Sequence, residues 1–300
     1  MLQEEFDSAF LDYIQQLWHL TDVTAGVLLS NKNGRIVHQI QAREGMFTLK
    51  ILSPQTTARQ VNGDTSVLIF LNAQAPGMAP RLILTGAGCA FARYNDQFLY
   101  LLSFIDGVHP EWNDETFSLL GARAADLHLL SGYTRPWSID PIDELRQARL
   151  RAQQYPTALQ TDFLALIDKL PDFNKLPQGL VHTDIGPHNA LHNANNILTF
   201  IDWDGAGIGP TLFDLAYPLI DEFIRDEQGE LFFATTWAHA FFSQYQSRHP
   251  LTTMEQELLV DAAIFWGIAY SACYEISNWW RYLKFVRDHR HEIEAVIAIP

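Results

Sequence analysis

The chain contains little cysteine and little positive charge. Its two cysteines, Cys89 and Cys273, are far apart and outside any CxxC spacing, which argues against a disulfide framework or a cysteine-based zinc site. Lysine and arginine number 20 against 35 aspartates and glutamates, so the formal net charge is -15. Such an acidic surface repels nucleic acid and anionic lipid, so neither is an expected partner. It attracts cations, including Mg²⁺ and amine-bearing small molecules.

Long apolar runs are also absent. The longest strongly apolar stretch, residues 262–274, lies between Asp261 and Glu275 and is shorter than the ~20 residues that cross a bilayer. The N-terminal sequence MLQEEFDSAF is acidic and does not resemble a secretory leader. Hydrophobic residues nevertheless make up 48% of the chain, which is enough for a substantial core. We therefore expect a cytoplasmic globular protein with one large domain or two smaller ones.

The first hundred residues predict an α+β unit built on an antiparallel sheet. Apolar residues recur at helical spacing near the N-terminus, and β-rich runs separated by the turn signals NKNG and REG follow. The expected elements are helices over 6–20 and 56–72, strands over 27–30, 35–41 and 46–52, and two or three more strands within 80–105 that turn at YND. A sheet with packed helices is the expected architecture here.

The second part of the chain predicts a mainly helical unit. Helical periodicity is seen over 115–130, 143–151, 157–170, 212–226, 231–247 and 255–286. Only residues 179–204 interrupt it, with short β segments around the asparagine-rich turn HNANN. The change near residues 105–110 predicts a boundary there, with one unit over 1–105 and the other over 106–300.

One segment, GLVHTDIGPHNALHNANNILTFIDWDGAGIGPTLFDLAYPL, places acids and amides at the edges of apolar stretches. Asp184 and Asn189 lie five residues apart on a loop, and Asp202 follows the β-rich run ILTFID. A hairpin that turns at NANN would bring Asp202 back toward Asn189. One amide oxygen and one carboxylate suit Mg²⁺, a hard ion that takes few protein ligands. Asp184 would stand nearby as a proton acceptor, and this set of groups is typical of phosphoryl transfer.

These motifs carry a family resemblance. HTDIGPHN resembles the H-x-D-x-x-x-x-N catalytic loop of the aminoglycoside phosphotransferase and choline kinase superfamily, relatives of the protein kinases. FIDWDGAGIGPTLFDLAYPL is similar to the I-D-[WF]-[DE] segment that follows it there. MFTLKI resembles the third N-lobe strand, YLLSFIDG the linker between the lobes, and LLGARAADLHLL the first C-lobe helix. The resemblance spans residues 27–219.

The resemblance implies a two-lobed, protein-kinase-like α+β fold. It also implies transfer of the γ-phosphoryl group of ATP, or of GTP, to a hydroxyl of a small molecule. Asp184 would face that hydroxyl, Asn189 and Asp202 would hold Mg²⁺, and Lys50 would bind the nucleotide phosphates. Asp64 is the expected partner of Lys50, at a position where the family usually has a glutamate.

The resemblance assigns further roles around the site. The backbone around three linker residues would contact the adenine; they are Ser103, Phe104 and Ile105. Asp214 would brace the catalytic loop. Asp204 would bind a second metal ion or accept bonds from neighbouring backbone amides. The C-terminal helices would form the acceptor pocket, with aromatic candidates Trp266, Tyr270, Tyr274, Trp279 and Trp280 and cation-binding candidates Asp221, Glu222 and Glu275.

Some features depart from the family pattern or leave other functions open. The first N-lobe turn, SNKNG, has one glycine where the family often has a pair. A metal-dependent phosphoesterase that uses His182, Asp184 and Asp202 is one alternative, although His182 is more simply a structural residue of the loop. A catalytically silent kinase-like module is another. His188 and His192 are expected at the surface.

Overall fold

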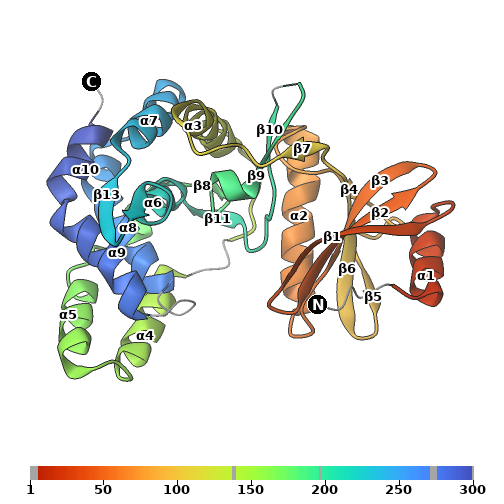
Figure 1. Ribbon diagram of the computed structural model, residues 1–300, viewed down its shortest axis with the longest axis horizontal. Coiled ribbons are helices and arrows are strands. Elements are labelled where there is room, and N and C mark those ends of the chain that lie inside the picture. The colour runs from red at the N-terminus through yellow and green to blue at the C-terminus, as the bar shows by residue number, and fades with distance from the viewer. Residues whose placement is uncertain (1–5, 137–139, 196, 271–275, 299–300) are drawn as a thin grey trace. The chain divides into compact units, whose positions relative to one another are not determined.

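The computed structural model describes residues 6–136, 140–195, 197–270 and 276–298 (Figure 1). The chain divides into two compact units. Unit 1 runs to Val108 and includes Leu191–Asp204, and unit 2 comprises His109–Ala190 and the chain from Gly205 onward. The boundary at Val108 lies within the region where the sequence changes character. The segment Leu191–Asp204 clusters with unit 1, whereas the sequence division at residue 105 placed it in the second part.

Unit 1 contains the antiparallel sheet expected from the sequence, with strand order β1-β2-β3-β6-β4 and β5 paired to β6. Its strands are β1 Thr24–Lys32, β2 Arg35–Ala42, β3 Gly45–Ile51, β4 Leu82–Ile83, β5 Ala92–Tyr94 and β6 Gln97–Ser103. Asn33 and Gly34 join β1 to β2 with φ angles of 52° and 74°. Two successive positive φ angles are typical of the type I′ hairpin turn, which asparagine and glycine favour.

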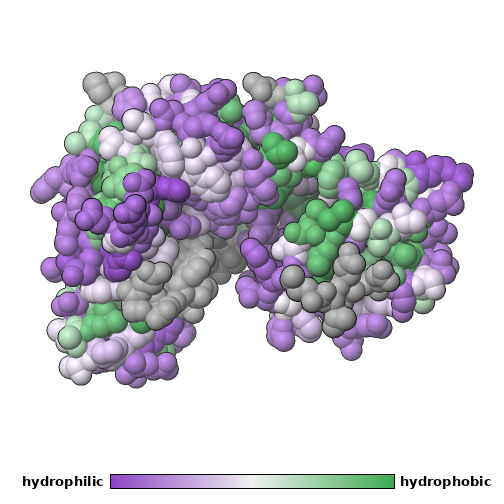
Figure 2. Space-filling view, in the orientation of Figure 1, coloured by the Kyte–Doolittle hydropathy of each residue, from purple (hydrophilic) through white to green (hydrophobic). Residues whose placement is uncertain are grey.

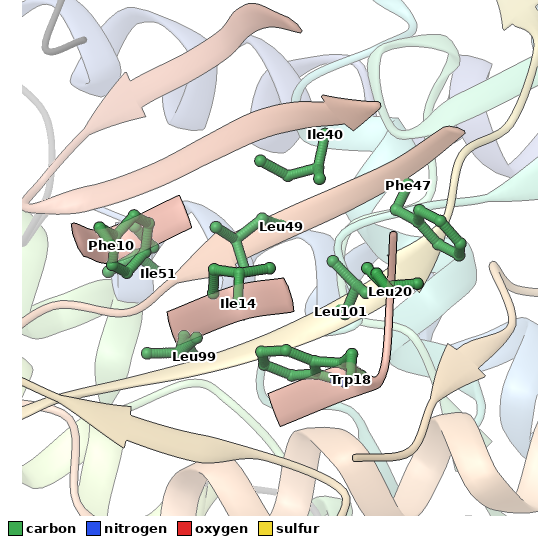
Figure 3. Packing of buried hydrophobic residues seen from close by; sticks show 10 residues of the cluster. All are labelled: Phe10, Ile14, Trp18, Leu20, Ile40, Phe47, Leu49, Ile51, Leu99 and Leu101. Atoms are coloured by element: carbon green, nitrogen blue, oxygen red, sulfur yellow. The ribbon is translucent and has the colours of Figure 1, made fainter. Parts of the chain in front are cut away.

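One helix packs on the sheet of unit 1, and the hydrophobic core of the unit lies between them. Helix α1, Ser8–Trp18, starts at Asp7, whose carboxylate accepts a hydrogen bond from the Phe10 amide. Figure 3 shows the apolar face of α1 together with side chains from β2, β3 and β6. The cluster comprises Phe10, Ile14, Trp18, Leu20, Ile40, Phe47, Leu49, Ile51, Leu99 and Leu101. Because these side chains are withdrawn from water, the cluster fixes the strands that carry the charged residues of unit 1.

A second helix and a hairpin complete unit 1. Helix α2, Ala58–Gln74, begins with a capping box formed by Thr57 and Gln60 and packs beside β4 and β6. The expected hairpin is present as β9, Ala190–Asn193, and β10, Leu198–Phe200, with β7, Gly107–Val108, pairing to β9. The Phe200 amide donates to the carbonyl of Met78 at 3.0 Å. These bonds explain why the hairpin belongs with unit 1.

Unit 2 is mainly helical, as the sequence predicts. Its helices are α3 Asp114–His128, α4 Pro141–Ala152, α5 Thr157–Ile167, α6 Leu212–Ile220, α7 Thr235–Arg248, α8 Thr253–Tyr270, α9 Ile276–Asp288 and α10 Arg290–Ile297, with short 3₁₀ turns η1 Phe173–Lys175 and η2 Pro187–Asn189. Helix α3 packs along α7, and α6 packs against α8. Every residue of α6 is buried, so its polar members must find partners inside the unit.

Two antiparallel strand pairs complete unit 2. One pairs β8, Gln178–Val181, with β11, Gly207–Pro210, and the other pairs β12, Ile224–Glu227, with β13, Glu230–Phe233. The expected helix over 212–226 is therefore wrong beyond residue 220. The apolar periodicity continues past α6, but Gln228 and Gly229 adopt positive φ angles and turn the chain into a hairpin.

Two further observations concern the C-terminal helices and the surface. The expected helix over 255–286 contains α8 and α9, with residues 271–275 between them outside the described residues.

Within the described part of the chain, no helix combines the length and apolar character needed to cross a bilayer. Figure 2 shows hydrophilic residues over most of the face in view, which agrees with the acidic composition.

The contact between α3 and α7 depends on Gly121. A Cβ atom at this position would overlap the backbone carbonyl of Phe241. We therefore expect Gly121→Ala to lower the free energy of unfolding by about 1–3 kcal/mol, although alanine favours a helix, because overpacking forces backbone shifts. Chemical denaturation would measure this effect. Ser118→Ala on the same helix is the control, and equal stability of the two variants would contradict the close-approach explanation.

Candidate active site

Lys50 lies at the centre of a charged cluster in unit 1. Its side chain is buried on β3, and its ammonium group donates to Asp202 Oδ1 and to Asp204 Oδ1, each at 2.6 Å. Burial alone would lower the pKa of Lys50, but Tyr100, Asp204 and Asp202 outweigh burial and hold its pKa well above the ordinary value. Lys50 is therefore a cation, and in this structure two carboxylates compensate its charge.

Tyr100 and Asp64 surround the same lysine. Tyr100 stands opposite Lys50 in the register of β6 and β3, and its buried hydroxyl lies 3.4 Å from Asp204 Oδ1. Burial raises the pKa of Tyr100 well above its ordinary value, and the charge of Asp64, a buried residue of α2, adds to this rise. Lys50 forms its two short ion pairs with Asp202 and Asp204. The role of Asp64 as a partner of Lys50 stays a prediction.

Asp204 bridges two cations. Besides Lys50, it pairs with Arg35, whose Nη1 lies 2.7 Å from Asp204 Oδ2. These contacts add to the two roles expected for Asp204, a second metal or neighbouring amides, and both of those roles stay predictions. Arg35 was missed in the sequence because an arginine next to a turn is ordinarily solvated. The one available signal was its place directly after the Asn-Gly turn.

The acids of unit 1 suit a hard cation. Asp202 has a φ angle of 59°, and half of its side chain is exposed although one oxygen contacts Lys50. A second carboxylate, Asp204, reaches the same ammonium group. No group of three or more histidine, cysteine or acidic side chains among the described residues is arranged to hold a metal by itself. A half-exposed carboxylate such as Asp202 fits Mg²⁺, which usually keeps several waters and substrate oxygens as ligands.

Two backbone amides of the linker, those of Ser103 and Phe104, already donate hydrogen bonds. The Ser103 amide donates to the Arg81 carbonyl at 2.7 Å, and the Phe104 amide donates to the Met46 carbonyl at 3.3 Å. These two amides are therefore already used within unit 1. The assignment of this segment to the adenine stays a prediction.

In unit 2, Asp214 holds the backbone of the loop HTDIGPHN, which is the proposed catalytic loop. Asp214 is fully buried on α6. Its Oδ2 accepts from the His182 amide at 2.8 Å, and its Oδ1 accepts from the Thr183 amide at 2.6 Å. Thr183 has a φ angle of 84°, a strained conformation for a non-glycine residue that persists only when its surroundings impose it. Asp214 therefore sets the backbone that presents the next residue, Asp184.

Side chains from two other helices orient Asp214. His128 on α3 contacts Asp214 Oδ2 through Nε2 at 3.1 Å, and its Nδ1 lies 2.8 Å from the hydroxyl of Tyr245 on α7. All three side chains are buried. In a low-dielectric interior such a fully partnered network rigidifies the groups it joins. The loop is thus fixed by three helices of unit 2.

Asp184 is held on both carboxylate oxygens. His188 Nε2 lies 3.2 Å from Oδ1, and the amide nitrogen of Asn189 donates to Oδ2 at 2.7 Å. Burial would raise the pKa of Asp184, but His188, Tyr217 and His182 together lower it below the ordinary value. Asp184 is therefore an ionised carboxylate. Both side-chain hydrogen bonds of Asn189 use its nitrogen, which leaves its amide oxygen as the atom for a metal ion.

His188 also contacts Glu222, which is 4% exposed. The two groups lie 2.7 Å apart, and the Trp112 indole donates to the other oxygen of Glu222 at 2.8 Å. Burial opposes the charge on His188, but Asp184 and Glu222 raise its pKa to about 10. A Cβ at Gly186 would overlap Glu222, so glycine is needed there. The expectation of an ordinary surface role for His188 misses these contacts, because residues 188 and 222 are distant in the sequence.

The proposed acceptor-pocket residues have different surroundings. Trp266 and Trp279 are buried, and their indole groups donate to the carbonyls of Phe213 and Gly267, so both are core residues. Asp221 accepts from the Tyr217 hydroxyl at 2.7 Å, and burial raises its pKa. Glu222 is already paired with His188. Tyr274 and Glu275 lie outside the described residues, as does the Tyr270 side chain. Asp221 remains the described acid that fits a cationic ligand.

The antiparallel N-terminal sheet and the helical C-terminal region define a protein-kinase-like α+β fold, as expected from the sequence. The model of the phosphotransferase enzyme family matches residues 30–251, which include Lys50, the catalytic loop, and both acids of the IDWD segment. This chain belongs to that family.

Similar proteins agree with this assignment. A homoserine kinase of Polaromonas naphthalenivorans is 36% identical over 87 residues, which are 29% of this chain and 27% of that protein. The chain thus matches about a quarter of that relative's length. A homoserine kinase of Gluconobacter oxydans is 25% identical over 231 residues, 73% of this chain and 72% of that protein. The structure of amicoumacin kinase hAmiN with AMP-PNP and Ca²⁺ has a TM-score of 0.68 at 17% identity, covering 98% and 96% of the two chains.

The raised pKa of His188 predicts a pH-dependent stability. Protonated His188 forms ion pairs with both Asp184 and Glu222. These ion pairs contribute fully to stability below the unfolded-state pKa of histidine, about 6.5. The contribution is lost as the pH rises toward the folded-state pKa of His188, about 10. The stability advantage of the unmodified protein over His188→Gln should therefore shrink between pH 6.5 and 10. Its slope should stay below the ~1.4 kcal/mol per pH unit of a full proton difference, since solvent screens a partly exposed group.

Denaturant unfolding at pH 6.5, 8 and 9.5 would measure this difference. His291→Gln is the matched control, because the His291 side chain is 98% exposed. A constant difference between the unmodified protein and His188→Gln across this range would show that His188 is not held as a cation.

Proposed function

We propose that this chain transfers the γ-phosphoryl group of ATP, or of GTP, to a hydroxyl group of a small molecule. Membership of the phosphotransferase enzyme family supports the reaction class. The observation that carries the proposal is the state of Asp184, an ionised carboxylate at the position of the family's catalytic aspartate, with one oxygen held by His188 and the other by Asn189. A carboxylate fixed in this way suits the task of orienting a hydroxyl group.

Each proposed residue has a defined task. Asp184 orients the acceptor hydroxyl and takes its proton late in the transfer. Lys50 binds phosphate oxygens, a role supported by its cationic state. Asn189 and Asp202 are the proposed Mg²⁺ ligands, assigned from the spacing of the sequence motif. The bound ion would neutralise charge on the phosphate oxygens.

The proposed acceptor carries an amine as well as a hydroxyl group. Three observations support this class: the net charge of -15, the partly buried carboxyl of Asp221 beside Tyr217, and the names of the relatives, which include two homoserine kinases. An ammonium group would compensate the charge of a carboxylate that is partly withdrawn from water. We place the reaction in the cytoplasm, with nucleotide and acceptor as partners and with neither nucleic acid nor membrane.

The two alternatives are less well supported. A phosphoesterase would need His182 as a metal ligand, but His182 is fully buried and its Nδ1 accepts from the Asp184 amide at 3.3 Å. A silent module would not need an ionised Asp184 held on both oxygens. Saturable thermal stabilisation by Mg-ATP would argue against the phosphoesterase, since a specific ligand raises apparent stability.

Replacing the proposed catalytic carboxylate tests the mechanism directly. Asp184→Asn should lower kcat by about 10²–10⁴-fold, because asparagine cannot accept the proton. Its stabilisation by Mg-ATP in a thermal-shift assay should persist. Asp168→Asn, which changes an exposed acid of unit 2, should keep both properties. Unchanged turnover in Asp184→Asn would remove Asp184 from its assigned role.

An acceptor screen tests the substrate class. Purified protein with Mg-ATP should consume ATP faster with amino alcohols and aminoglycosides than with matched alcohols or sugars that lack an amine. Asp221→Asn should raise KM for the amine-bearing acceptors more than it lowers kcat, because Asp221 is proposed to bind the ground state as well as the transition state. If no acceptor stimulates ATP consumption above background, the silent module would be the better explanation.

A further inference from the structure

The first hairpin of the sheet raises a question about phosphate binding. Lys32 pairs with Arg35, so the turn consists of Asn33 and Gly34 alone. A tight two-residue turn has few backbone N–H groups to offer, whereas a longer glycine-rich loop can surround a phosphate with them. A chain in this family that binds a nucleotide would therefore benefit from another donor beside the turn.

Arg35 is placed to be that donor. Val37 on β2 pairs with Lys50 on β3, so their side chains point to the same face of the sheet. Arg35 lies two residues before Val37 on the same strand, and alternate residues share a face. Arg35 and Lys50 are therefore diagonal neighbours on one face of the sheet, at a spacing that long side chains can bridge.

Asp204 now lies between these two cations. Its Oδ1 accepts from Lys50 at 2.6 Å, and its Oδ2 pairs with Arg35 at 2.7 Å. The carboxylate is 11% exposed, while 45% of the Arg35 side chain is exposed. One anion that places separate oxygens beside an ammonium and a guanidinium group has the arrangement expected of a phosphate, since both cations attract carboxylate and phosphate oxygens alike.

We propose that Arg35 is a phosphate-binding residue, and that Asp204 occupies the place of a nucleotide phosphate between Arg35 and Lys50. The inference rests on the proposed function and adds a binding residue to it. When a nucleotide binds, one of its phosphate groups replaces the Asp204 carboxylate on both cations. No covalent bond changes in this exchange. The guanidinium group supplies the donors that the short turn lacks.

A purely structural ion pair is the competing explanation for Arg35 and Asp204. The chain offers a matched example in the same unit, because Arg43 pairs with Asp22 at 2.6 Å on an exposed surface. Loss of a purely structural ion pair would lower stability and change the affinity for adenosine, ADP and ATP by the same factor. A phosphate-binding arginine affects ligands according to their phosphate groups, so a series from adenosine to ATP separates the two explanations.

The experiment measures the affinity of the full chain for adenosine, ADP and ATP by isothermal titration calorimetry in the presence of Mg²⁺. Arg35→Gln should weaken ADP or ATP binding by about tenfold or more, as expected for a lost charge-assisted hydrogen bond, and leave adenosine binding unchanged. Arg35→Lys should restore part of the affinity, because the charge remains and the guanidinium fork is lost. Arg43→Gln should match the unmodified protein.

The outcomes distinguish this inference from the proposed function. If the unmodified protein binds ATP and Arg35→Gln binds it equally well, the inference is wrong and the proposed function stands. An equal loss for adenosine and ATP would also overturn the inference, because Arg35 would then act through the fold. If the unmodified protein binds no nucleotide, both are wrong.

A second variant tests the place of Asp204. In the presence of EDTA, Asp204→Asn should bind ADP several-fold more tightly than the unmodified protein, because the one anion that contacts both cations has been removed and Lys50 keeps only Asp202. Metal-free conditions are needed so that any metal-binding role of Asp204 does not contribute. Equal or weaker ADP binding would overturn the statement that Asp204 occupies a phosphate position.

Discussion

Buried charge needs a partner, and the internal partners of Asp214 organise unit 2. The carboxylate is withdrawn from water at the start of α6, where an unpaired charge would be strongly unfavourable. Two consecutive backbone amides, of His182 and Thr183, satisfy it, and His128 supplies a third contact. Thr183 donates one of these bonds through its own amide, and its left-handed conformation sets the direction in which the chain continues to Asp184. The strain at Thr183 and the orientation of Asp184 are thus two consequences of one buried carboxylate.

The same constraint has a different result in unit 1. Lys50 is buried among apolar strand residues, so it also needs partners, and two acids of the IDWD segment provide them. These partners differ from those of Asp214 because they are side chains at the end of a hairpin, one of them half exposed. A charge satisfied by backbone amides is fixed in place, whereas a charge satisfied by side chains can exchange them for another anion. This difference suits the proposed roles of the two places, a rigid catalytic loop in unit 2 and a phosphate site in unit 1.

The sequence predicts those parts of the site that are set by local order. Asp184 and Asn189 lie within one loop, and their hydrogen bond at 2.7 Å follows from that spacing. The strands of the sheet follow from period-two patterns and an Asn-Gly turn. The β12–β13 hairpin was missed because its apolar residues continue the helical period of α6, and only the turn residues Gln228 and Gly229 contradict it.

Pairings between distant residues were not predictable from local order. Glu222 with His188, and Arg35 with Asp204, join segments whose approach is decided by packing of whole helices and strands. A single sequence contains no signal for such pairs beyond their charge, and acidic and basic residues are most often solvated. The clue that remains is indirect: a turn of only two residues offers few backbone N–H groups to a phosphate, so an additional cation nearby is worth seeking.

Charge balance connects the proposed binding of a nucleotide to unit 1 with the proposed binding of a metal ion. Two cations, Arg35 and Lys50, are now matched by two acids, Asp202 and Asp204. A phosphate that takes over the cations leaves the acids without their partners, at a cost that grows with burial. A divalent cation restores the balance, because it binds carboxylate and phosphate oxygens together. Nucleotide and metal ion should therefore bind this unit cooperatively, each relieving the uncompensated charge that the other would create alone.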